Sequence, residues 1–325
     1  MPRTAEQSDA GAPAIRLRRL VKRYDRRTAL RGIDLEIAGA QIVGVVGPDG
    51  AGKTTLLRTL AGLLEVEADE ADVLGIDLRG DVTRLKEILG YVPQLFSLYP
   101  ELSVHENLSV VARLHMLDRG ELERRAMPVL ERTGLAPFLD RQVGKLSGGM
   151  KQKLAVTAAL LPNPRILILD EPTAGVDVVA RDQIWSILSE RKDDVLILIS
   201  TSYLEEVAAC DRLVYLDEGR VVAVGAPAEL CAGVPLELYR AWGDDPRAIA
   251  RAVRALPYVD GARAAGRFAR IEVRRDASPG AARVLADLAA LRDAGVRLAE
   301  GLPLDVESML LALSRAGAVH GERAA

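Results

Sequence analysis

Cysteine is scarce in this sequence, and it contains neither long apolar runs nor an excess of basic charge. The two cysteines, Cys210 and Cys231, form neither a CxxC pair nor a secreted disulfide framework, which favours inert thiols in a reducing, cytosolic setting. The longest apolar runs, at 154–161 and 195–199, fall far short of the ~18 residues that a membrane-spanning helix needs. If the protein works at a membrane, another chain must span it.

The charge balance argues against nucleic-acid binding. Lys and Arg number 43 against 46 Asp and Glu, so the formal charge of -3 provides no general basic field. A hydrophobic content of 49% over 325 residues is enough for a large core, and the length favours two domains. Residues 1–13 are polar without the apolar segment of a signal peptide, and we expect a disordered tail there.

Apolar periodicity from residue 14 to about 224 predicts an α/β domain. Strands are expected at 31–37, where polar and apolar residues alternate, and at 42–46, 166–169 and 195–199, which read as buried. Ser103 and Glu106 form a capping box that opens a helix. A further helix is expected at 151–161, so residues of about 95–160 are predicted to be mainly helical.

The character of the chain changes after residue 227, since the last ninety or so residues contain no Lys and many Arg and Ala. We place a boundary near Gly233, which separates a domain at 14–233 from an accessory or regulatory domain at 234–325. The predicted element order of the second domain is strand, helix, two strands, helix, strand and a last helix. This order suggests a small ferredoxin-like α+β module.

A phosphate-binding loop follows the predicted strand at 42–46. It matches the pattern GxxxxGK[ST] through Gly47, Pro48, Asp49, Gly50, Ala51, Gly52, Lys53 and Thr54. Glycines let backbone N–H groups face a phosphate at the start of a helix, Lys53 is placed to contact the β- and γ-phosphates, and Thr54 offers a hydroxyl to Mg²⁺. ATP or GTP binding is therefore strongly favoured.

Two acids end the predicted strand at 166–169. Asp170 is placed to hold Mg²⁺, and Glu171 to polarise an attacking water. The alternative, a strand that ends in solvated charges, loses weight because a phosphate loop lies upstream.

Between these motifs stands LSGGMKQK, with Ser147, Gly148 and Gly149 directly ahead of a predicted helix. With the phosphate loop before it and Asp170 after it, this segment resembles the signature motif of ATP-binding-cassette (ABC) ATPases. The resemblance covers about residues 15–230. It implies a P-loop NTPase fold with a mixed sheet and a helical subdomain, ATP and Mg²⁺ as ligands, and a signature segment that contacts the γ-phosphate held by a partner cassette.

The resemblance also assigns roles to single residues. Tyr24 corresponds to the aromatic side chain that stacks on adenine, and Gln94 to the glutamine that contacts Mg²⁺ or the lytic water. Asp177 corresponds to the aspartate that crosses the dimer interface, and Thr55 completes the ATP-binding loop in GPDGAGKTT.

The sequence departs from the family pattern in two places. Ser202 stands where the family usually has a histidine that contacts the γ-phosphate, and serine is shorter and cannot become cationic. Residues 65–72 are acidic and free of glycine where a Pro/Gly turn is common, which predicts an altered loop.

The motif set looks most like the first cassette of tandem-cassette multidrug (ABC-2-type) exporter ATPases. This resemblance implies an ATPase on the inner face of the plasma membrane, bound to an ABC-2-type permease around residues 94–102, and paired with a second cassette that keeps the histidine. Catalysis would rest on Glu171, Gln94 and Ser202. A homodimer, a catalytically weak regulatory cassette, a soluble ABC ATPase and an importer ATPase remain open alternatives, and the sequence does not name the cargo.

Overall fold

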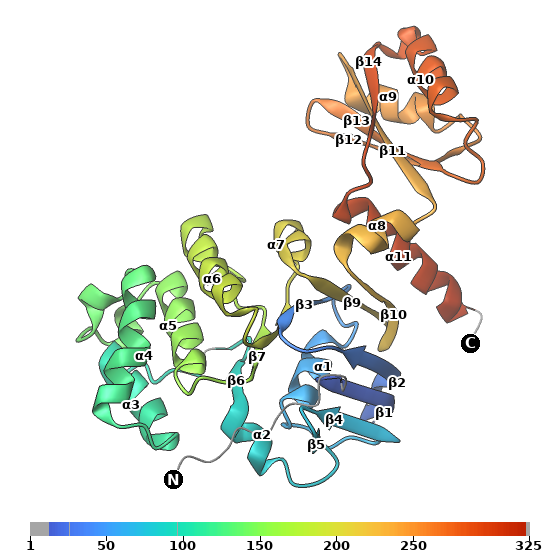
Figure 1. The fold of residues 1–325 in the computed structure, drawn as a ribbon. Coiled ribbons are helices and arrows are strands. Elements are labelled where there is room, and N and C mark those ends of the chain that lie inside the picture. Colours follow the sequence, from blue (N-terminus) through green and yellow to red (C-terminus); the bar gives the residue numbers. More distant parts are fainter. Residues whose placement is uncertain (1–12, 26, 96, 323–325) are drawn as a thin grey trace. The chain divides into compact units, whose positions relative to one another are not determined.

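The chain divides into two compact units between Gly225 and Ala226 (Figure 1). The computed structural model describes residues 13–25, 27–95 and 97–322, so residues 1–12 of the expected tail lie outside the described residues. We placed the boundary near Gly233, which is the last residue of α8 (Pro227–Gly233). This helix contacts α11 (Val306–Glu322) of the same unit, and for this reason the second unit begins before α8.

A six-stranded sheet forms the centre of the first unit, in the order β10-β9-β3-β8-β7-β6. Its strands are β3 (Gln41–Val46), β6 (Leu89–Val92), β7 (Ile166–Asp170), β8 (Leu196–Ser200), β9 (Arg212–Asp217) and β10 (Arg220–Gly225). The neighbours from β9 to β6 run parallel, and β10 pairs antiparallel with β9. Strands β7 and β8 are buried throughout, as their continuous apolar sequences predict. The carboxyl ends of these parallel strands lie at the same edge of the sheet, and the candidate site described below is formed at this edge.

A smaller antiparallel sheet lies in the same unit, in the order β2-β1-β4-β5. Its strands are β1 (Ile15–Tyr24), β2 (Arg27–Ile37), β4 (Glu70–Val73) and β5 (Ile76–Asp77). Helix α1 (Lys53–Leu60) buries Leu56, Leu57 and Leu60 in a hydrophobic cluster that includes residues of both sheets. Helix α2 (Thr83–Ile88) leads into β6. The phosphate loop is therefore attached to a helix fixed by the main core.

The acidic stretch at 65–72 is ordered against β1. Strand β4 pairs antiparallel with β1, and Arg16 lies 3.0 Å from Glu70 across this pairing. Two further ion pairs join Arg19 to Asp69 and Arg23 to Glu67. The acids in this stretch thus compensate arginines of the neighbouring strand, in pairs that are exposed and contribute little to stability.

Helices occupy most of the region from 95 to 160, beside the central sheet (Figure 1). They are α3 (Val104–Leu114), α4 (Arg119–Arg132), η1 (Ala136–Phe138), η2 (Val143–Lys145) and α5 (Gly148–Leu160). The predicted capping box opens α3, since Ser103 Oγ accepts the Glu106 N–H at 3.1 Å and Glu106 Oε2 accepts the Ser103 N–H at 2.7 Å. Helix α6 (Val178–Arg191) packs on α5, and α7 (Leu204–Ala209) follows β8.

The second unit has the predicted element order. Its elements after α8 are β11 (Leu236–Gly243), α9 (Pro246–Val253), β12 (Val259–Ala265), β13 (Phe268–Arg274), α10 (Ala281–Ala290), η3 (Arg292–Ala294), β14 (Val296–Leu302) and α11. The sheet order β12-β13-β11-β14 is antiparallel throughout, which is the ferredoxin-like arrangement. Apolar residues of α9 and α10 form its core with the sheet.

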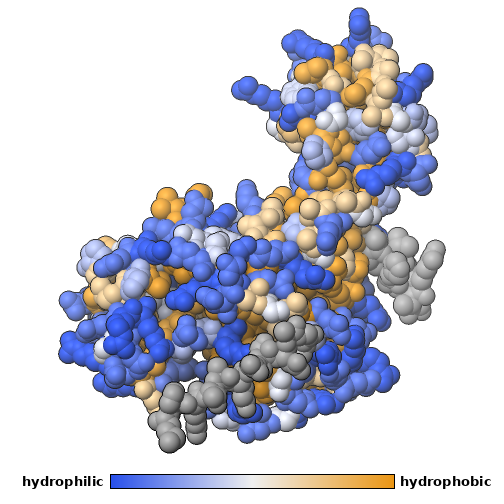
Figure 2. Space-filling view, viewed as in Figure 1, coloured by the Kyte–Doolittle hydropathy of each residue, from blue (hydrophilic) through white to orange (hydrophobic). Residues whose placement is uncertain are grey.

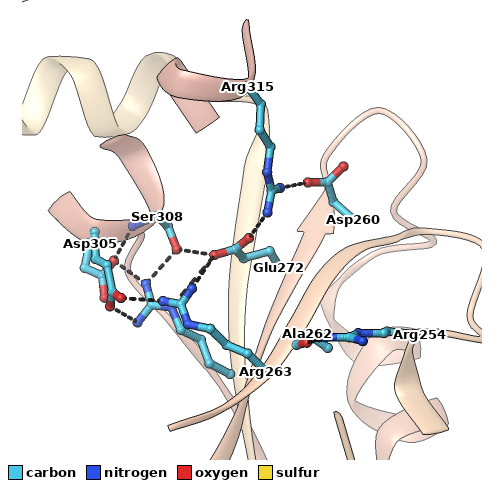
Figure 3. Close-up of polar contacts among 10 residues, drawn as sticks. Arg254, Asp260, Ala262, Arg263, Glu272, Asp305, Ser308 and Arg315 are labelled. Atoms are coloured by element: carbon cyan, nitrogen blue, oxygen red, sulfur yellow. Dashed lines mark hydrogen bonds and ion pairs between the residues drawn. The ribbon is translucent and has the colours of Figure 1, made fainter. Parts of the chain in front are cut away.

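Helix α11 is held to this sheet by charged and polar side chains (Figure 3). Buried Arg270 pairs with Asp305, and its Nη2 donates to Ser308 Oγ at 2.6 Å. Ser308 donates in turn to Glu272 Oε1 at 2.9 Å, and Arg315 lies 3.6 Å from Glu272 Oε2. The last helix is therefore attached to the sheet by a connected network of polar groups.

Among the described residues, no helix combines the length and the apolar character that crossing a bilayer requires. Figure 2 shows a face on which hydrophilic side chains predominate and hydrophobic ones occur in separate groups.

Candidate functional site

The phosphate loop connects β3 to α1 through backbone conformations that need glycine. Gly47 has φ 148°, and a Cβ built on it would lie 2.0 Å from the carbonyl oxygen of Leu216. Gly52 has φ 108° directly ahead of α1. No side chain caps this helix, so N–H groups of its first turn remain available to an anion.

Lys53 is folded back over the loop. Its side chain is only 7% exposed, and Nζ donates to the carbonyl oxygens of Gly47 at 2.8 Å and Pro48 at 3.1 Å. Asp49 Oδ1 lies 3.8 Å from the same Nζ. The ammonium group is thus held inside the loop, where it can bind phosphate oxygens.

Asp170 lies completely buried at the carboxyl end of β7. Its Oδ1 accepts hydrogen bonds from Thr54 Oγ1 at 3.1 Å and from Ser200 Oγ at 2.8 Å. Its Oδ2 is buried without a hydrogen-bond partner among the described atoms. An unpartnered buried carboxylate oxygen beside a threonine hydroxyl is a donor set that suits Mg²⁺.

Glu171 turns away from the strand into the site. Its φ of 50° is unusual for a residue with a side chain, and its N–H donates to Ser200 Oγ at 2.8 Å. Gln94, which follows β6, donates from Nε2 to Glu171 Oε2 at 3.1 Å. The two side chains predicted to handle the attacking water are therefore in contact.

A cavity of about 330 Å³ gathers half of the predicted residues. Its walls are Tyr24, Arg27, Ala29, Asp49, Gly50, Gly52, Lys53, Thr54, Thr55, Gln94 and Glu171. Tyr24 is 42% exposed at the end of β1, with Lys22 Nζ 5.5 Å from its ring centroid. The arrangement offers an aromatic face, a phosphate loop and the Glu171 carboxylate in one cavity, which is the chemistry needed for a nucleoside triphosphate.

The signature segment does not join this cavity. Ser147 caps α5, where its Oγ accepts the Met150 N–H at 3.3 Å, and both Ser147 and Gly148 are exposed. Gly149 is buried, and a Cβ there would lie 3.0 Å from Ala180 and 3.3 Å from Asp177 Oδ2. Asp177 itself caps α6 through the Ala180 N–H at 2.9 Å.

Ser202 also lies outside the lining of the cavity. It is exposed and has no hydrogen-bond partner among the described residues. Its neighbour Thr201 is buried and donates to Glu206, while the Tyr203 N–H donates back to Thr201 Oγ1 at 3.1 Å. The Arg181 guanidinium carbon stands 3.7 Å from the Tyr203 ring centroid. Both neighbours of Ser202 are therefore held in place, whereas the Ser202 side chain itself has no partner among the described residues.

Two polar residues at the site were not predicted from the sequence. Ser200 bridges Asp170 and Glu171, and Arg27 lines the cavity and donates to the carbonyl oxygen of Gly50 at 3.2 Å. The sequence indicates only that Ser200 lies at the end of a buried strand. Its pairing with Asp170 follows only when β7 and β8 are known to be neighbours. Arg27 belongs to none of the sequence motifs described above.

Burial also affects a titratable side chain beside this site. Desolvation raises the pKa of the Tyr91 phenol, and the negative charge of Asp170 raises it further, while the nearby Arg58 lowers it in part. Tyr91 therefore stays neutral at physiological pH.

Comparison with known proteins agrees with this geometry. The family profile described as "ABC transporter" matches residues 30–174. The probable multidrug ABC transporter ATP-binding protein YbhF of Escherichia coli (strain K12) is 38% identical over 271 residues, which are 82% of this chain and 47% of YbhF. The linearmycin resistance ATP-binding protein LnrL of Bacillus subtilis (strain 168) is 35% identical over 213 residues, covering 65% of this chain and 68% of LnrL.

A solved structure supports the same fold assignment. The dimeric structure of a bacterial ABC transporter cassette superposes with a TM-score of 0.61 at 27% identity, over 65% of this chain and 98% of that one. The chain spans about half the length of YbhF. The predicted α/β, P-loop NTPase class is confirmed, and the chain belongs to the family of ABC transporter ATP-binding proteins.

Proposed function

We propose that this chain is the ATP-binding and ATP-hydrolysing subunit of a membrane exporter of the multidrug (ABC-2) type. The main support for this proposal is that the phosphate-binding cavity and the signature segment lie at separate places on the same chain. The cavity around Lys53 holds the phosphate-binding and acidic side chains, whereas Ser147 and Gly148 are exposed outside it. ATP bound in the cavity would be enclosed only when a second cassette contributes its signature segment, so ATP binding drives association and hydrolysis releases it.

Thr54 and Asp170 are the residues that would hold Mg²⁺. The free Oδ2 of Asp170 and the Thr54 hydroxyl would supply oxygen ligands, and Gln94 contacts the neighbouring Glu171. When bound between these residues, Mg²⁺ would neutralise negative charge on the phosphate oxygens.

The remaining groups act on the phosphates and the water. Lys53 exchanges its loop carbonyl contacts for phosphate oxygens, and the N–H groups at the start of α1 bind the same anion. Glu171 accepts a proton from the attacking water, and the Gln94 amide orients this carboxylate at 3.1 Å. Tyr24 provides the stacking surface for adenine.

A groove beside α3 is the proposed docking surface for the permease. It has a volume of about 180 Å³ and is lined by residues that include Leu98, Tyr99, Val111 and Leu114. Apolar side chains around it are unusually exposed for a folded protein. They are Leu95 at 81%, Tyr99 at 53%, Leu114 at 75% and Met116 at 91%. This surface suits an apolar segment of an integral-membrane partner, which would place the chain peripherally on the inner face of the plasma membrane.

A heterodimer is preferred because of Ser202. Its short, exposed side chain has no partner among the described residues and cannot supply the cationic γ-phosphate contact of a histidine. The site formed by this chain's Lys53 would then be slow, and the site completed by its Ser147 would be the faster one. The same observation supports the second candidate function, a catalytically weak regulatory cassette.

Replacing Ser202 by histidine tests this assignment. We expect Ser202→His to raise the steady-state ATPase rate of the purified chain by at least about tenfold, because a charged hydrogen bond to the transferred phosphate is worth ~1.5 kcal/mol or more. Ser202→Asn is the matched control, since it adds bulk and an amide without a positive charge. Equal rates for all three proteins would contradict the role given to this position, and failure to bind ATP would overturn the proposed function itself.

A further inference from the structure

A second cavity lies among α4, α5 and α6, and no function described above involves it. Its volume of about 490 Å³ falls in the range of small-molecule sites, and it shares no lining residue with the ATP cavity. Four arginines and a single acid, Glu190, line it. The arginines are Arg124, Arg125, Arg132 and Arg191.

The arginines come from one face of α4 and from the end of α6. Positions 124, 125, 128, 129 and 132 lie at spacings that share a helix face, and all five line the cavity. Arg132 and Arg191 lie in the last turns of α4 and α6, where a positive charge stabilises the carboxyl end of a helix, and this role explains an arginine at each position. Arg124 lies two turns earlier on α4, so helix-end stabilisation does not account for it.

Two of these guanidinium groups have no partner in the described part of the chain. Arg125 lies 2.9 Å from Glu121 Oε1 and donates to the Leu161 carbonyl oxygen at 3.2 Å, and Arg132 pairs with Glu190. The side chains of Arg124 and Arg191 make no hydrogen bond or ion pair with any described residue. Their donors remain available, and planar guanidinium groups match phosphate oxygens in geometry and charge.

The floor of the cavity is apolar. Val129, Leu160 and Ile187 line it and are 8%, 6% and 3% exposed, so they belong to the packed interface of the three helices. A ligand that satisfies the whole cavity therefore carries negative charge at one end and an apolar body at the other.

We propose that this cavity binds a phosphate ester with an apolar body. The phosphate oxygens pair with the Arg124 and Arg191 guanidinium groups, and the apolar body covers Val129 and Ile187. A soluble phosphate ester and the headgroup region of an anionic phospholipid share this chemistry. The inference rests on the cavity alone and does not depend on the direction of transport or on the partner cassette.

The test uses the full chain with excess Mg-ADP, which occupies the phosphate loop. Calorimetry measures the affinity for phenyl phosphate, and sedimentation measures binding to vesicles of phosphatidylglycerol against vesicles of phosphatidylcholine. Arg124→Gln/Arg191→Gln should weaken binding by about tenfold or more. Glu190→Gln should strengthen it, because this change removes the only acid of the lining.

A double variant of equal charge provides the control. Arg84→Gln/Arg119→Gln removes two exposed arginines outside the cavity and should leave the affinity unchanged. Binding of phenyl phosphate identifies a soluble ester as a ligand, and selective binding to phosphatidylglycerol identifies a lipid; either supports the proposal when only the cavity variant weakens it. Absence of binding to both probes, or equal weakening by the two double variants, would overturn it.

Discussion

Ser200 donates a hydrogen bond from its hydroxyl to Asp170 Oδ1 at 2.8 Å. The Ser200 hydroxyl oxygen also accepts the Glu171 N–H at 2.8 Å, so one side chain on β8 orients both acids at the end of β7. Adjacent parallel strands place these residues in register. The bridge leaves Asp170 Oδ2 free, which is the oxygen that we assign to Mg²⁺.

Removing this hydroxyl should impair catalysis more than nucleotide binding. Ser200→Ala deletes one acceptor and one donor in a buried position, and we expect kcat to fall by about tenfold, with a higher Mg²⁺ concentration needed for half-maximal rate. Steady-state ATPase assays against MgCl2 concentration measure both effects. Ser200→Thr keeps the hydroxyl and should retain most of the rate, whereas an unchanged Mg²⁺ dependence in Ser200→Ala would contradict the bridging role.

Tyr24 should contribute to ATP affinity through its ring. Tyr24→Ala removes the aromatic wall of the cavity, and the expected weakening is about tenfold, since stacking on a base is worth ~1 to 3 kcal/mol. Tyr24→Phe keeps the ring and should bind ATP like the wild type. Equilibrium binding in the Glu171→Gln background measures affinity without turnover, and equal affinities for the two variants would show that the ring does not stack.

The attachment of α11 should weaken in acid. Burial acts to raise the pKa of Asp305, but hydrogen bonds from Arg270 and the Ser308 N–H outweigh it and lower the pKa in the folded state (Figure 3). The ionised carboxylate therefore stabilises the fold above its ordinary pKa, and this contribution is lost as the pH falls through the lowered value. The thermal unfolding temperature of the wild type should therefore fall in this acid range.

Asp305→Asn tests the source of this acid sensitivity. The variant should be less stable at neutral pH and show a smaller decrease in unfolding temperature toward pH 3, because it lacks the titrating group. Asp276→Asn removes an exposed carboxylate that makes no ion pair with a described residue, and it should follow the wild-type curve. Identical pH profiles for Asp305→Asn and the wild type would rule out Asp305 as a contributor.

The two thiols should differ in reactivity. Burial, together with the nearby Glu206 and Asp211 charges, raises the pKa of Cys210 to about 12, and its side chain is 4% exposed. Cys231 is only partly buried. At pH 8, a thiol reagent should modify Cys231 in the native chain and Cys210 only after unfolding. The single variants Cys210→Ser and Cys231→Ser assign the two rates, and rapid native labelling of Cys210 would contradict its burial.

Local sequence patterns predicted much of the fold and of the ATP cavity. Buried parallel strands produce unbroken apolar runs, and a phosphate loop must be short and glycine-rich, so β3, β7 and α1 were found from contiguous residues. The order of the strands in the sheets determines the remaining contacts, which are those of Ser200, of Arg27 and of the acids at 65–72. That information is absent from any single segment.

The boundary between the two units and the arginine-lined cavity likewise depend on contacts between distant segments, which a single segment of sequence does not reveal. The change of composition after residue 227 predicts a boundary only approximately, near Gly233, whereas the contact that places α8 in the second unit is made with α11, more than seventy positions away. The cavity combines side chains from three helices, and its unpaired arginines look like ordinary surface residues in the sequence.

The most direct test of the account measures ATPase rate and self-association of the purified chain over a range of protein concentration, with Mg-ATP and with Glu171→Gln alongside. A chain that depends on a histidine-containing partner cassette should bind ATP and hydrolyse it negligibly at every protein concentration. Turnover that rises with concentration, accompanies dimer formation and disappears in Glu171→Gln would contradict the heterodimer and show that two copies of this chain form a complete site.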